Sequence, residues 1–503
     1  MLYLYAALPI LLVLALMLFF NRGSHQAGFA GWLAGIVIAT LAFGLNFSVF
    51  WVSQVKGLLL TINVLAVLWS ALLLYHIVDK AGGVRAIANA LQEMIPEPGW
   101  LLVVLAWMLS PLVENLAGFG IPIAIVAPML ILLGVIPVRA VAAVAVGHSW
   151  AVSLSGMALA LRTLTDIVGM EAAEVFPTAS LLLGVSVLLT GLATAWLLKQ
   201  LHYWKRIVLL AVVVALAQHL VGLAGMIPLS SFFASIAGIA GGMLLSKRAP
   251  GEKPRANMTP QLKGGLVSYG ILVFSIIVVS VIKPLNQWLA GVRLVSQFPE
   301  VITNTGLVTA AGSGFIFKPF VHPGFWILVS AIMAAALLPR ITRGGGTNIA
   351  EALKATWHSA LPATLGTIFM IGLSTLMEHT GMTMQIAEGL SLAFGSVYPL
   401  MAPLVGTLGA FATGSNTNSN ILFGLMQNGV ALLLGISPVL LLAAQTTGGS
   451  LGSMIAPAKL AVGGSTNAMK GREGEVLRMT LPIGLGCTLI IGGLALILSK
   501  LIN

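Results

Sequence analysis

Long apolar stretches recur along this chain of 503 residues, and they limit what it can fold into. Each has close to the ~20 residues that an α-helix needs to cross the hydrocarbon core of a bilayer. We expect membrane-spanning helices near residues 2–20, 28–51, 56–78, 138–161, 177–198, 206–224, 226–246, 264–283, 323–339, 355–377, 437–458 and 479–499. Only 8% of the residues are charged, whereas a soluble protein has about 25%. The sequence therefore predicts an all-α polytopic membrane protein with about twelve transmembrane helices.

Two further apolar regions, 99–136 and 397–435, are interrupted by proline, glycine and polar residues. Neither region forms clean spanning helices, so we expect two re-entrant hairpins whose tips stop inside the membrane. Backbone that leaves a helix at that depth is tolerated only where protein buries it or where it lines a water-filled cavity. The helices that follow, 138–161 and 437–458, contain polar residues and glycines in mid-span, and we expect both to be broken.

The basic residues predict which side of the membrane each loop faces. With the basic loop at 247–263 placed in the cytoplasm, alternating the spans leaves six of the 25 Lys and Arg residues outside: Lys56, Arg162, Lys283, Arg293, Lys318 and Lys500. That bias follows the positive-inside rule, so the net charge of +11 indicates orientation rather than nucleic-acid binding. We expect a multi-pass protein of the cell membrane with both termini outside the cytoplasm. The first apolar stretch has no basic residue before it, and we expect it to be retained.

Three sequence patterns occur twice in the same order, which indicates an internal repeat. Asp79-x-x-Gly82 recurs as Glu378-x-x-Gly381, Pro111-Leu112-Val113 as Pro403-Leu404-Val405, and Gly147-x-Ser149 as Gly448-x-Ser450. We therefore divide the chain into a first repeat at 1–198, a linker at 199–263 with two helices and the basic loop, and a second repeat at 264–503. Each repeat crosses the membrane five times and the linker twice. The repeats are then inverted, as in many secondary transporters.

Polar residues are concentrated in the hairpins and broken helices, where we expect the substrate to bind. Glycine lets a ligand approach the backbone closely, and the free N–H groups at a helix start suit a carboxylate. Small polar residues also pack membrane helices together, but the eight consecutive polar or glycine residues at 413–420 exceed what packing needs. The candidate substrate-binding residues are Asn115, Gly118, Gly120, Ser149, Thr413, Gly414, Ser415, Asn416, Thr417, Asn418, Ser419, Asn420, Thr446, Thr447, Gly448 and Ser450. We expect the substrate carboxylate at the second hairpin and at a helix break from Thr446 to Gly448.

Two ionisable residues within the membrane are candidates for proton coupling. Glu114 lies in the first hairpin and His148 in the first broken helix, and ionisable groups at such depth mark functional sites. The alternatives are a buried ion pair at Glu114 and a hydrogen-bonded core histidine at His148. Lys459 ends the second broken helix, and we expect it to extend towards the membrane surface. Contact with the substrate is the alternative. No spacing of His or Cys typical of metal ligands occurs, and the longest polar stretches are too short for a catalytic domain. We expect neither a metal nor a cofactor, and no enzymatic activity.

Three motifs resemble the L-lactate permease family along most of the chain. They are Glu114-x-x-Ala117-Gly118-Phe119-Gly120-x-Pro122, the run Thr413 to Asn420, and Thr446-Thr447-Gly448-Gly449 followed by Met454-Ile455-x-Pro457. The resemblance implies uptake of lactate or glycolate with a proton. It also implies kinship with the ion-transporter superfamily, whose members are often homodimers with a moving transport domain. The chain departs from the family pattern at Asn416, where the relatives have Asp, and at Gly147-His148-Ser149.

The leading hypothesis is a secondary active transporter that imports L-lactate, or else D-lactate or glycolate, by proton symport. A sodium-coupled carrier of another organic anion is an alternative, because hairpin tips rich in Asn, Ser and Thr can coordinate sodium. An ion channel is a weaker alternative. We expect an elevator mechanism in which residues 99–163 and 397–460 form the transport domain. The helices at 2–51 and 264–339 would form the scaffold and the homodimer contact.

Overall fold

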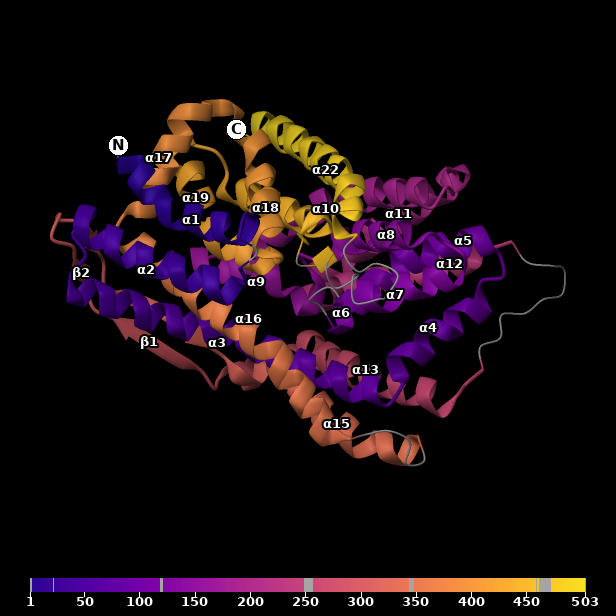
Figure 1. The fold of residues 1–503 in the computed structure, drawn as a ribbon. Coiled ribbons are helices and arrows are strands. Elements are labelled where there is room, and N and C mark those ends of the chain that lie inside the picture. Colours follow the sequence, from indigo (N-terminus) through magenta and orange to yellow (C-terminus); the bar gives the residue numbers. More distant parts are fainter. Residues whose placement is uncertain are drawn as a thin grey trace.

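The computed structural model describes residues 2–20, 22–117, 121–247, 257–342, 348–457, 459–460 and 472–502. Helices dominate, and they run alongside one another in an elongated body (Figure 1). The first part contains α1 (Leu2–Leu18), α2 (Ser24–Ala42), α3 (Phe47–Lys80), α4 (Gly83–Met94), α5 (Pro98–Val104), η1 (Leu105–Leu109), α6 (Ser110–Ala117), α7 (Ile121–Leu132), α8 (Pro137–His148), η2 (Ser149–Ala151), α9 (Ser155–Val168) and α10 (Ala172–Leu197).

The middle part consists of η3 (Leu201–Tyr203), α11 (Trp204–Val221), η4 (Gly222–Met226), η5 (Ile227–Leu229) and α12 (Ser230–Leu245). The last part contains α13 (Pro260–Val281), α14 (Lys283–Ala290), β1 (Leu294–Phe298), β2 (Val301–Ile302), β3 (Val308–Thr309), β4 (Gly312–Phe317), η6 (Pro319–Val321), α15 (Pro323–Ile341), α16 (Ile349–His379), α17 (Met382–Phe394), η7 (Gly395–Val397), α18 (Tyr398–Thr413), α19 (Asn416–Leu434), α20 (Pro438–Gly452), η8 (Ser453–Ile455) and α22 (Glu473–Ile502).

Ten helical stretches among the described residues are long and apolar enough to cross a membrane, or eleven if α8 and α9 count as one bent span. The sequence predicts about twelve. The difference arises partly because the predicted spans 206–224 and 226–246 fall in one stretch of 45 residues, Leu201–Leu245. That stretch is about twice the length that one crossing needs. Gly225, at φ 87°, interrupts it between the two predicted spans. The apolar part of α1 is also shorter, at Leu2–Met17.

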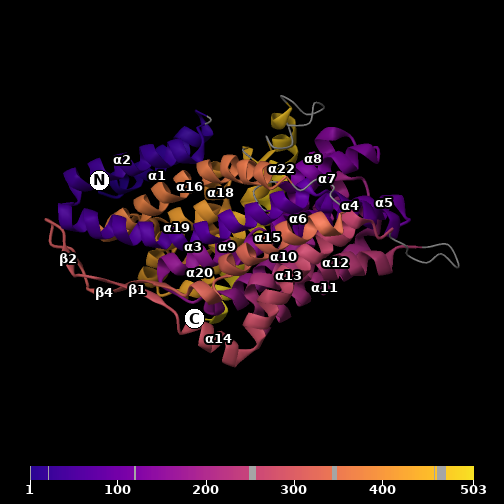
Figure 2. The same ribbon diagram turned by 90° about the horizontal axis from the view of Figure 1, so that it is seen from below.

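The prediction of an all-α chain is wrong between residues 294 and 317. There β1 pairs with β4, and β2 with β3, in two antiparallel two-stranded sheets. Both sheets lie beside α3 at one end of the molecule, opposite the end that holds α5 and α12 (Figures 1 and 2). Phe315 and Val301 are buried against that helix layer. Short strands rich in Val, Ile and Phe leave no mark in a search for apolar runs of about 20 residues.

The long helices α3 and α16 pack against each other in antiparallel orientation. Lys56 near the start of α3 pairs with Glu378 near the end of α16, with 3.3 Å between Nζ and Oε2. Lys80 at the end of α3 pairs with Glu351 at the start of α16, also at 3.3 Å. Between these ion pairs, Trp69 Nε1 donates a hydrogen bond to Thr364 Oγ1 (2.9 Å). The contacts at both ends show that the two helices run in opposite directions.

The repeated sequence pattern at the ends of α3 and α16 produces the same local structure twice. Gly82 follows α3 with φ 75°, and Gly381 follows α16 with φ 76°. This left-handed conformation favours glycine, and it turns the chain after each helix. The short helices α4 and α17 then begin directly after these glycines.

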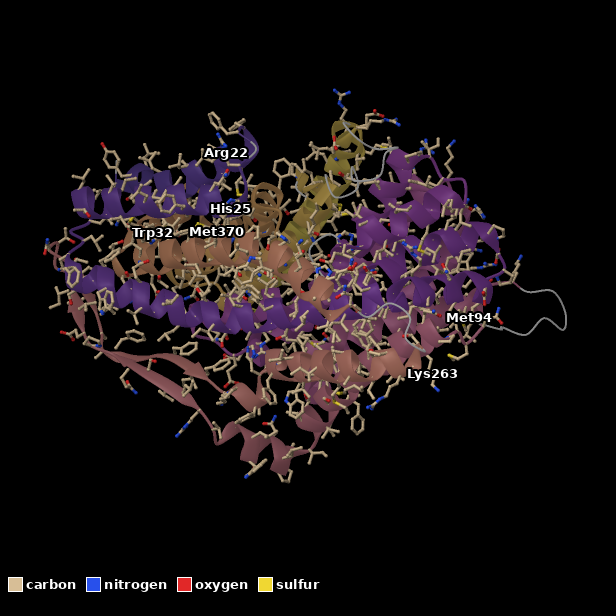
Figure 3. All side chains as sticks on the ribbon, turned by 60° about the horizontal axis from the view of Figure 1, so that its bottom comes forward. Arg22, His25, Trp32, Met94, Lys263 and Met370 are labelled. Carbon is tan, nitrogen blue, oxygen red and sulfur yellow. The ribbon has the colours of Figure 1, made fainter. Side chains whose placement is uncertain are left out.

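Apolar side chains form two large buried clusters. One contains Trp100, Trp107 and Trp150 and surrounds the α5–η1–α6 arm. The other joins α1, α2, α3 and α16. Figure 3 shows Trp32 of α2 and Met370 of α16 in this second region, far from Met94 and Lys263 at the other end of the molecule. In the most apolar window of Pro98–Leu116, 89% of the residues are buried, against 33% in Leu201–Leu245. The first arm of the first predicted hairpin is thus surrounded by protein, as its irregular backbone requires.

Candidate functional site

The tip of the second hairpin is a tight turn between α18 and α19. α18 ends at Thr413, Gly414 adopts φ 70°, and Ser415 caps α19 by accepting a hydrogen bond from the backbone of Asn418 (3.3 Å). Thr413 Oγ1 donates to the Ser415 carbonyl (2.9 Å) and holds the turn closed. The first N–H groups of α19, a helix of 19 residues, therefore start at this tip.

Two adjoining cavities meet at this tip. The larger has a volume of about 150 Å³, and its polar side is formed by Thr413, Gly414, Ser415, Thr417, Asn418 and Lys459. Its other side is mostly apolar, with Val64 and Leu68 from α3, Ala363 and Thr367 from α16, and Leu159 from α9. The smaller cavity, of about 60 Å³, adds Glu114, Val152, Ser155, Gly156, Ala160 and Asn416. Since a water molecule in the liquid occupies about 30 Å³, the larger cavity has room for a molecule of a few heavy atoms.

Glu114 and Lys459 form a buried ion pair between the hairpins. Lys459 Nζ lies 3.3 Å from Glu114 Oε1, and both residues are buried. Lys459 lines both cavities, and Glu114 lines the smaller one. The expectation that Lys459 extends to the membrane surface is wrong. Its helical turn, in which its N–H bonds to the Ala456 carbonyl (3.0 Å), places the ammonium group beside Glu114 in the interior. An ammonium group buried there is tolerated because a carboxylate compensates it.

Six of the predicted binding residues, Thr413 to Asn418, line one cavity or the other. Asn416 also crosses to the first broken helix, where its Nδ2 donates to Ser153 Oγ (2.9 Å). Ser153 Oγ in turn donates to the Thr446 carbonyl of α20 (2.7 Å). Sequence reasoning did not single out Ser153, which joins the second hairpin, the first broken helix and α20.

The other described candidates line neither cavity, and most of them bond elements together. Asn115 Nδ2 donates to the Pro111 carbonyl, and its Oδ1 accepts from Ser231 of α12. Ser419 donates to the Gly406 carbonyl, Asn420 to the Ala160 carbonyl and Thr446 Oγ1, and Ser450 to the Ser149 carbonyl. Thr447 bonds within α20 to the Ala443 carbonyl (2.7 Å). The predicted Gly118 and Gly120 lie outside the described residues.

The predicted break at Thr446 to Gly448 is wrong, because α20 is one helix from Pro438 to Gly452. Its glycines serve packing instead. A Cβ atom on Gly448 would overlap the backbone of Pro403 in α18, and one on Gly449 would overlap the side chain of Asn416. The chain leaves the helix only after η8, where Ala456 is extended (φ −67°, ψ 116°).

The first predicted broken helix is indeed broken, and His148 is the last residue of its first part. α8 ends at His148, and α9 is bent by 56° relative to α8. Gly156, Met157 and Ala158 have φ values of 55°, 63° and 57°, a conformation that L side chains rarely adopt. His148 is fully buried, its Nδ1 lies 2.7 Å from the Val144 carbonyl, and it lines neither cavity. It lies within electrostatic range of Glu114 and Lys459.

Sequence reasoning also missed a polar contact between α3 and α9. Asn63 Nδ2 of α3 donates to Asp166 Oδ2 of α9 (3.1 Å). Arg162 lies one helical turn before Asp166 and interacts with it electrostatically. The i, i+4 spacing of Arg162 and Asp166 is a sequence signal from which the Arg162–Asp166 pair could have been predicted. Asn63 offered no local signal.

The chain is similar to a known protein family over nearly its whole length. Residues 3–502 match the family described as L-lactate permease. The chain is 26% identical to an L-lactate permease of Streptococcus iniae, over 86% of this chain and 91% of that one. It is 24% identical to the glycolate permease GlcA of Escherichia coli (strain K12), over 98% and 94%. A crystal structure of the YdaH transporter of Alcanivorax borkumensis superposes with a TM-score of 0.43 and 17% identity, over 88% and 85%. From the family match over nearly its whole length, the chain belongs to the L-lactate permease family.

Proposed function

We propose that this protein imports a small monocarboxylate, L-lactate or else D-lactate or glycolate, by symport with a proton. The observation that carries the proposal is the larger cavity at the second hairpin. It combines the Lys459 ammonium group, the start of α19 and an apolar wall within about 150 Å³. The relatives named above are permeases for L-lactate and for glycolate, which belong to this class of compound.

Lactate has three kinds of group, and the cavity offers a partner for each. The carboxylate faces Lys459 and the N–H groups at the start of α19, where the helix dipole favours an anion. The hydroxyl is within the reach of Thr417 and Asn418. The methyl group packs against Val64 and Leu68, which also exclude larger polar substrates. Glycolate lacks the methyl group and fills the same polar side.

Transport by purified protein in proteoliposomes tests this proposal. With labelled L-lactate outside, an inward proton gradient is expected to drive accumulation that a protonophore abolishes, and an inward sodium gradient at equal pH is expected to drive none. Excess unlabelled glycolate or D-lactate should compete, whereas a dicarboxylate should not. Accumulation driven by sodium alone would refute proton symport. Absence of uptake and of exchange for all three monocarboxylates would refute the substrate class.

We also propose an elevator mechanism between two inverted repeats in a homodimer, with α3 and α16 added to the scaffold. The antiparallel packing of α3 and α16, which carry the same repeated pattern, supports inversion. So does the contact between Ser450 Oγ and the Ser149 carbonyl (2.6 Å), because these two serines occupy equivalent places in the repeat. The larger cavity lies between α3, α16 and the second hairpin, which is where a moving transport domain would carry its substrate past the scaffold.

Fixing the second hairpin to α16 is expected to stop transport. Ser374 Oγ of α16 donates to the Ile421 carbonyl of α19 (2.9 Å), and neither residue lines a cavity. In a Cys487→Ser background, oxidation of the Ser374→Cys/Ile421→Cys variant should abolish lactate exchange, and reduction should restore it. Each single cysteine variant, oxidised in the same way, is the control. Full exchange by the cross-linked protein would contradict movement between these elements.

A further inference from the structure

We propose that the linker helices α11 and α12 move together with the transport domain, to which Glu97 holds both of their ends. This inference rests on the proposed elevator mechanism and goes beyond it by assigning the linker helices to one of the two bodies. The stretch Leu201–Leu245 contains both helices, so its place decides how much of the protein each transport cycle displaces.

One carboxylate, that of Glu97, bonds to both ends of the linker helices. Glu97 directly precedes α5, where the proposed transport domain begins. Its Oε1 accepts a hydrogen bond from Tyr203 OH (2.9 Å), and its Oε2 accepts from Arg206 Nη1 (2.8 Å) and from the backbone N–H of Lys247 (2.9 Å). Tyr203 and Arg206 lie at the start of the linker helices, and Lys247 follows their end. The Glu97 and Arg206 side chains are only 18% and 20% exposed, so water and salt weaken this ion pair less than an exposed one.

Between these two ends, α12 packs closely along the α5–η1–α6 arm, and α12 lies beside α5 in both views (Figures 1 and 2). Trp100 Nε1 of α5 donates a hydrogen bond to the Gly242 carbonyl of α12 (2.7 Å). A Cβ atom on Gly242 would overlap the side chain of Val104, and one on Gly238 would overlap that of Met108. Glycines four residues apart let two membrane helices approach closely, so α12 and the arm fit each other as one packed unit.

The contact between the linker helices and the scaffold is of a different kind. The turn η4 between α11 and α12 lies against α13. All five residues of η4 are glycine, leucine, alanine or methionine, and no hydrogen bond or ion pair joins the described residues of η4 and α13. An apolar contact without hydrogen bonds can slide at little cost, whereas the contacts of Glu97 and Trp100 would have to break.

Two neighbouring carboxylates mark the boundary between the moving and the fixed body. Glu97 bonds to Lys247 on the moving side. Glu93 Oε2, on α4, accepts a hydrogen bond from the backbone N–H of Asn257 (2.9 Å), and α4 packs against α13 of the scaffold. Lys247 therefore belongs to the moving body and Asn257 to the fixed one.

Distances between spin labels on three exposed residues test this assignment. Leu132 of α7, Leu209 of α11 and Ile332 of α15 are 87%, 53% and 61% exposed, so labels there disturb little packing. The three pairwise double cysteine variants of the full chain, in a Cys487→Ser background, are measured in nanodiscs with and without L-lactate, at acid and at alkaline pH. The distances from Ile332 to Leu132 and to Leu209 are expected to shift together, while the distance between Leu132 and Leu209 stays constant.

Each other pattern of distances has a definite meaning. A shift between Leu132 and Leu209 with a constant distance from Leu209 to Ile332 would place the linker helices in the scaffold and overturn the inference. Shifts in all three distances would mean that the linker moves on its own, and would overturn it too. Three constant distances under every condition would refute the elevator mechanism. Lactate exchange by the same variants reports separately on the proposed transport, which is refuted if the wild type exchanges no small monocarboxylate.

A cross-link within the moving body provides a second test. A Cβ atom on Gly242 would lie 3.6 Å from Val104 Cβ, within the range of about 3.5–4.5 Å that a disulfide needs. In the Cys487→Ser background, oxidation of Val104→Cys/Gly242→Cys should leave lactate exchange at the level of the reduced protein. Oxidation of Ser374→Cys/Ile421→Cys should abolish it, as described above. Loss of exchange on oxidation of Val104→Cys/Gly242→Cys, reversed by reduction, would overturn the inference while leaving the transport function intact.

Discussion

Glu114→Gln is expected to abolish accumulation of lactate against a gradient while leaving lactate exchange across the membrane intact. Glutamine has the shape and neutrality of a protonated glutamic acid but cannot release a proton. Two carboxylates about 4 Å apart repel by about 4 kcal/mol at an effective dielectric constant of about 20. The variant never meets this repulsion, so it should bind lactate at least as tightly as the wild type. Its exchange should depend little on pH, because the coupling group no longer titrates.

Exchange and accumulation can be measured in the same proteoliposomes, with labelled lactate on one side and unlabelled lactate, or none, on the other. Glu351→Gln is the matched control, since it makes the same replacement in the exposed pair with Lys80 and should leave both activities unchanged. Proton-driven accumulation by Glu114→Gln would show that the ion pair with Lys459 is structural. The coupling group would then have to be sought at His148, which lies within electrostatic range of both residues.

The membrane fold could be predicted because each spanning helix depends on the composition of one continuous segment of the sequence. A helix that crosses a bilayer needs about 20 apolar residues in a row, and such runs are visible one at a time. The strands at 294–317 could not be predicted in the same way, because β1 pairs with β4 across the segment that contains β2 and β3, and each strand has at most six residues. The glycines of α20 were misjudged for another reason. A glycine permits a break in the helix and also permits close helix packing, and only the neighbouring helix decides between them.

Part of the candidate site was visible in the sequence, and part depended on the fold. The run of polar residues at the second hairpin is visible in the sequence, and Thr413 to Asn418 do line the two cavities. The partnership of Lys459 with Glu114 joins residues 345 positions apart, and no local pattern links them. A lysine at the end of an apolar run has the same sequence context whether it reaches the membrane surface or turns inwards. The turn after η8 determines the direction of the Lys459 side chain, and this turn depends on the tertiary structure.

Gly448→Ala is expected to prevent α20 from packing against α18, and so to cause a large loss of folded protein. The added methyl group would overlap the carbonyl group and Cα of Pro403. Overpacking against movable side chains costs about 1–3 kcal/mol, but backbone atoms cannot rotate aside, so we expect a cost at or above the upper end of that range. Gly147 meets the backbone of Ala106 in the same way at the equivalent place in the repeat, and Gly147→Ala should behave alike. Yield of monodisperse protein and the thermal unfolding midpoint measure the effect.

Gly270→Ala provides the matched control, because it makes the same replacement inside a membrane helix at a place where nothing approaches. Gly270 lies in α13, and a Cβ atom there meets no atom of the described residues within 4 Å. Alanine is favoured over glycine in a helix interior by about 0.5–1 kcal/mol, so this variant should be as stable as the wild type or slightly more so. The two substitutions are chemically identical, and only the distance to the neighbouring backbone separates them. A Gly448→Ala protein that unfolds at the wild-type temperature would mean that α18 and α20 can separate by the width of a methyl group, and α20 would then be a loosely held helix rather than the rigid support of the hairpin.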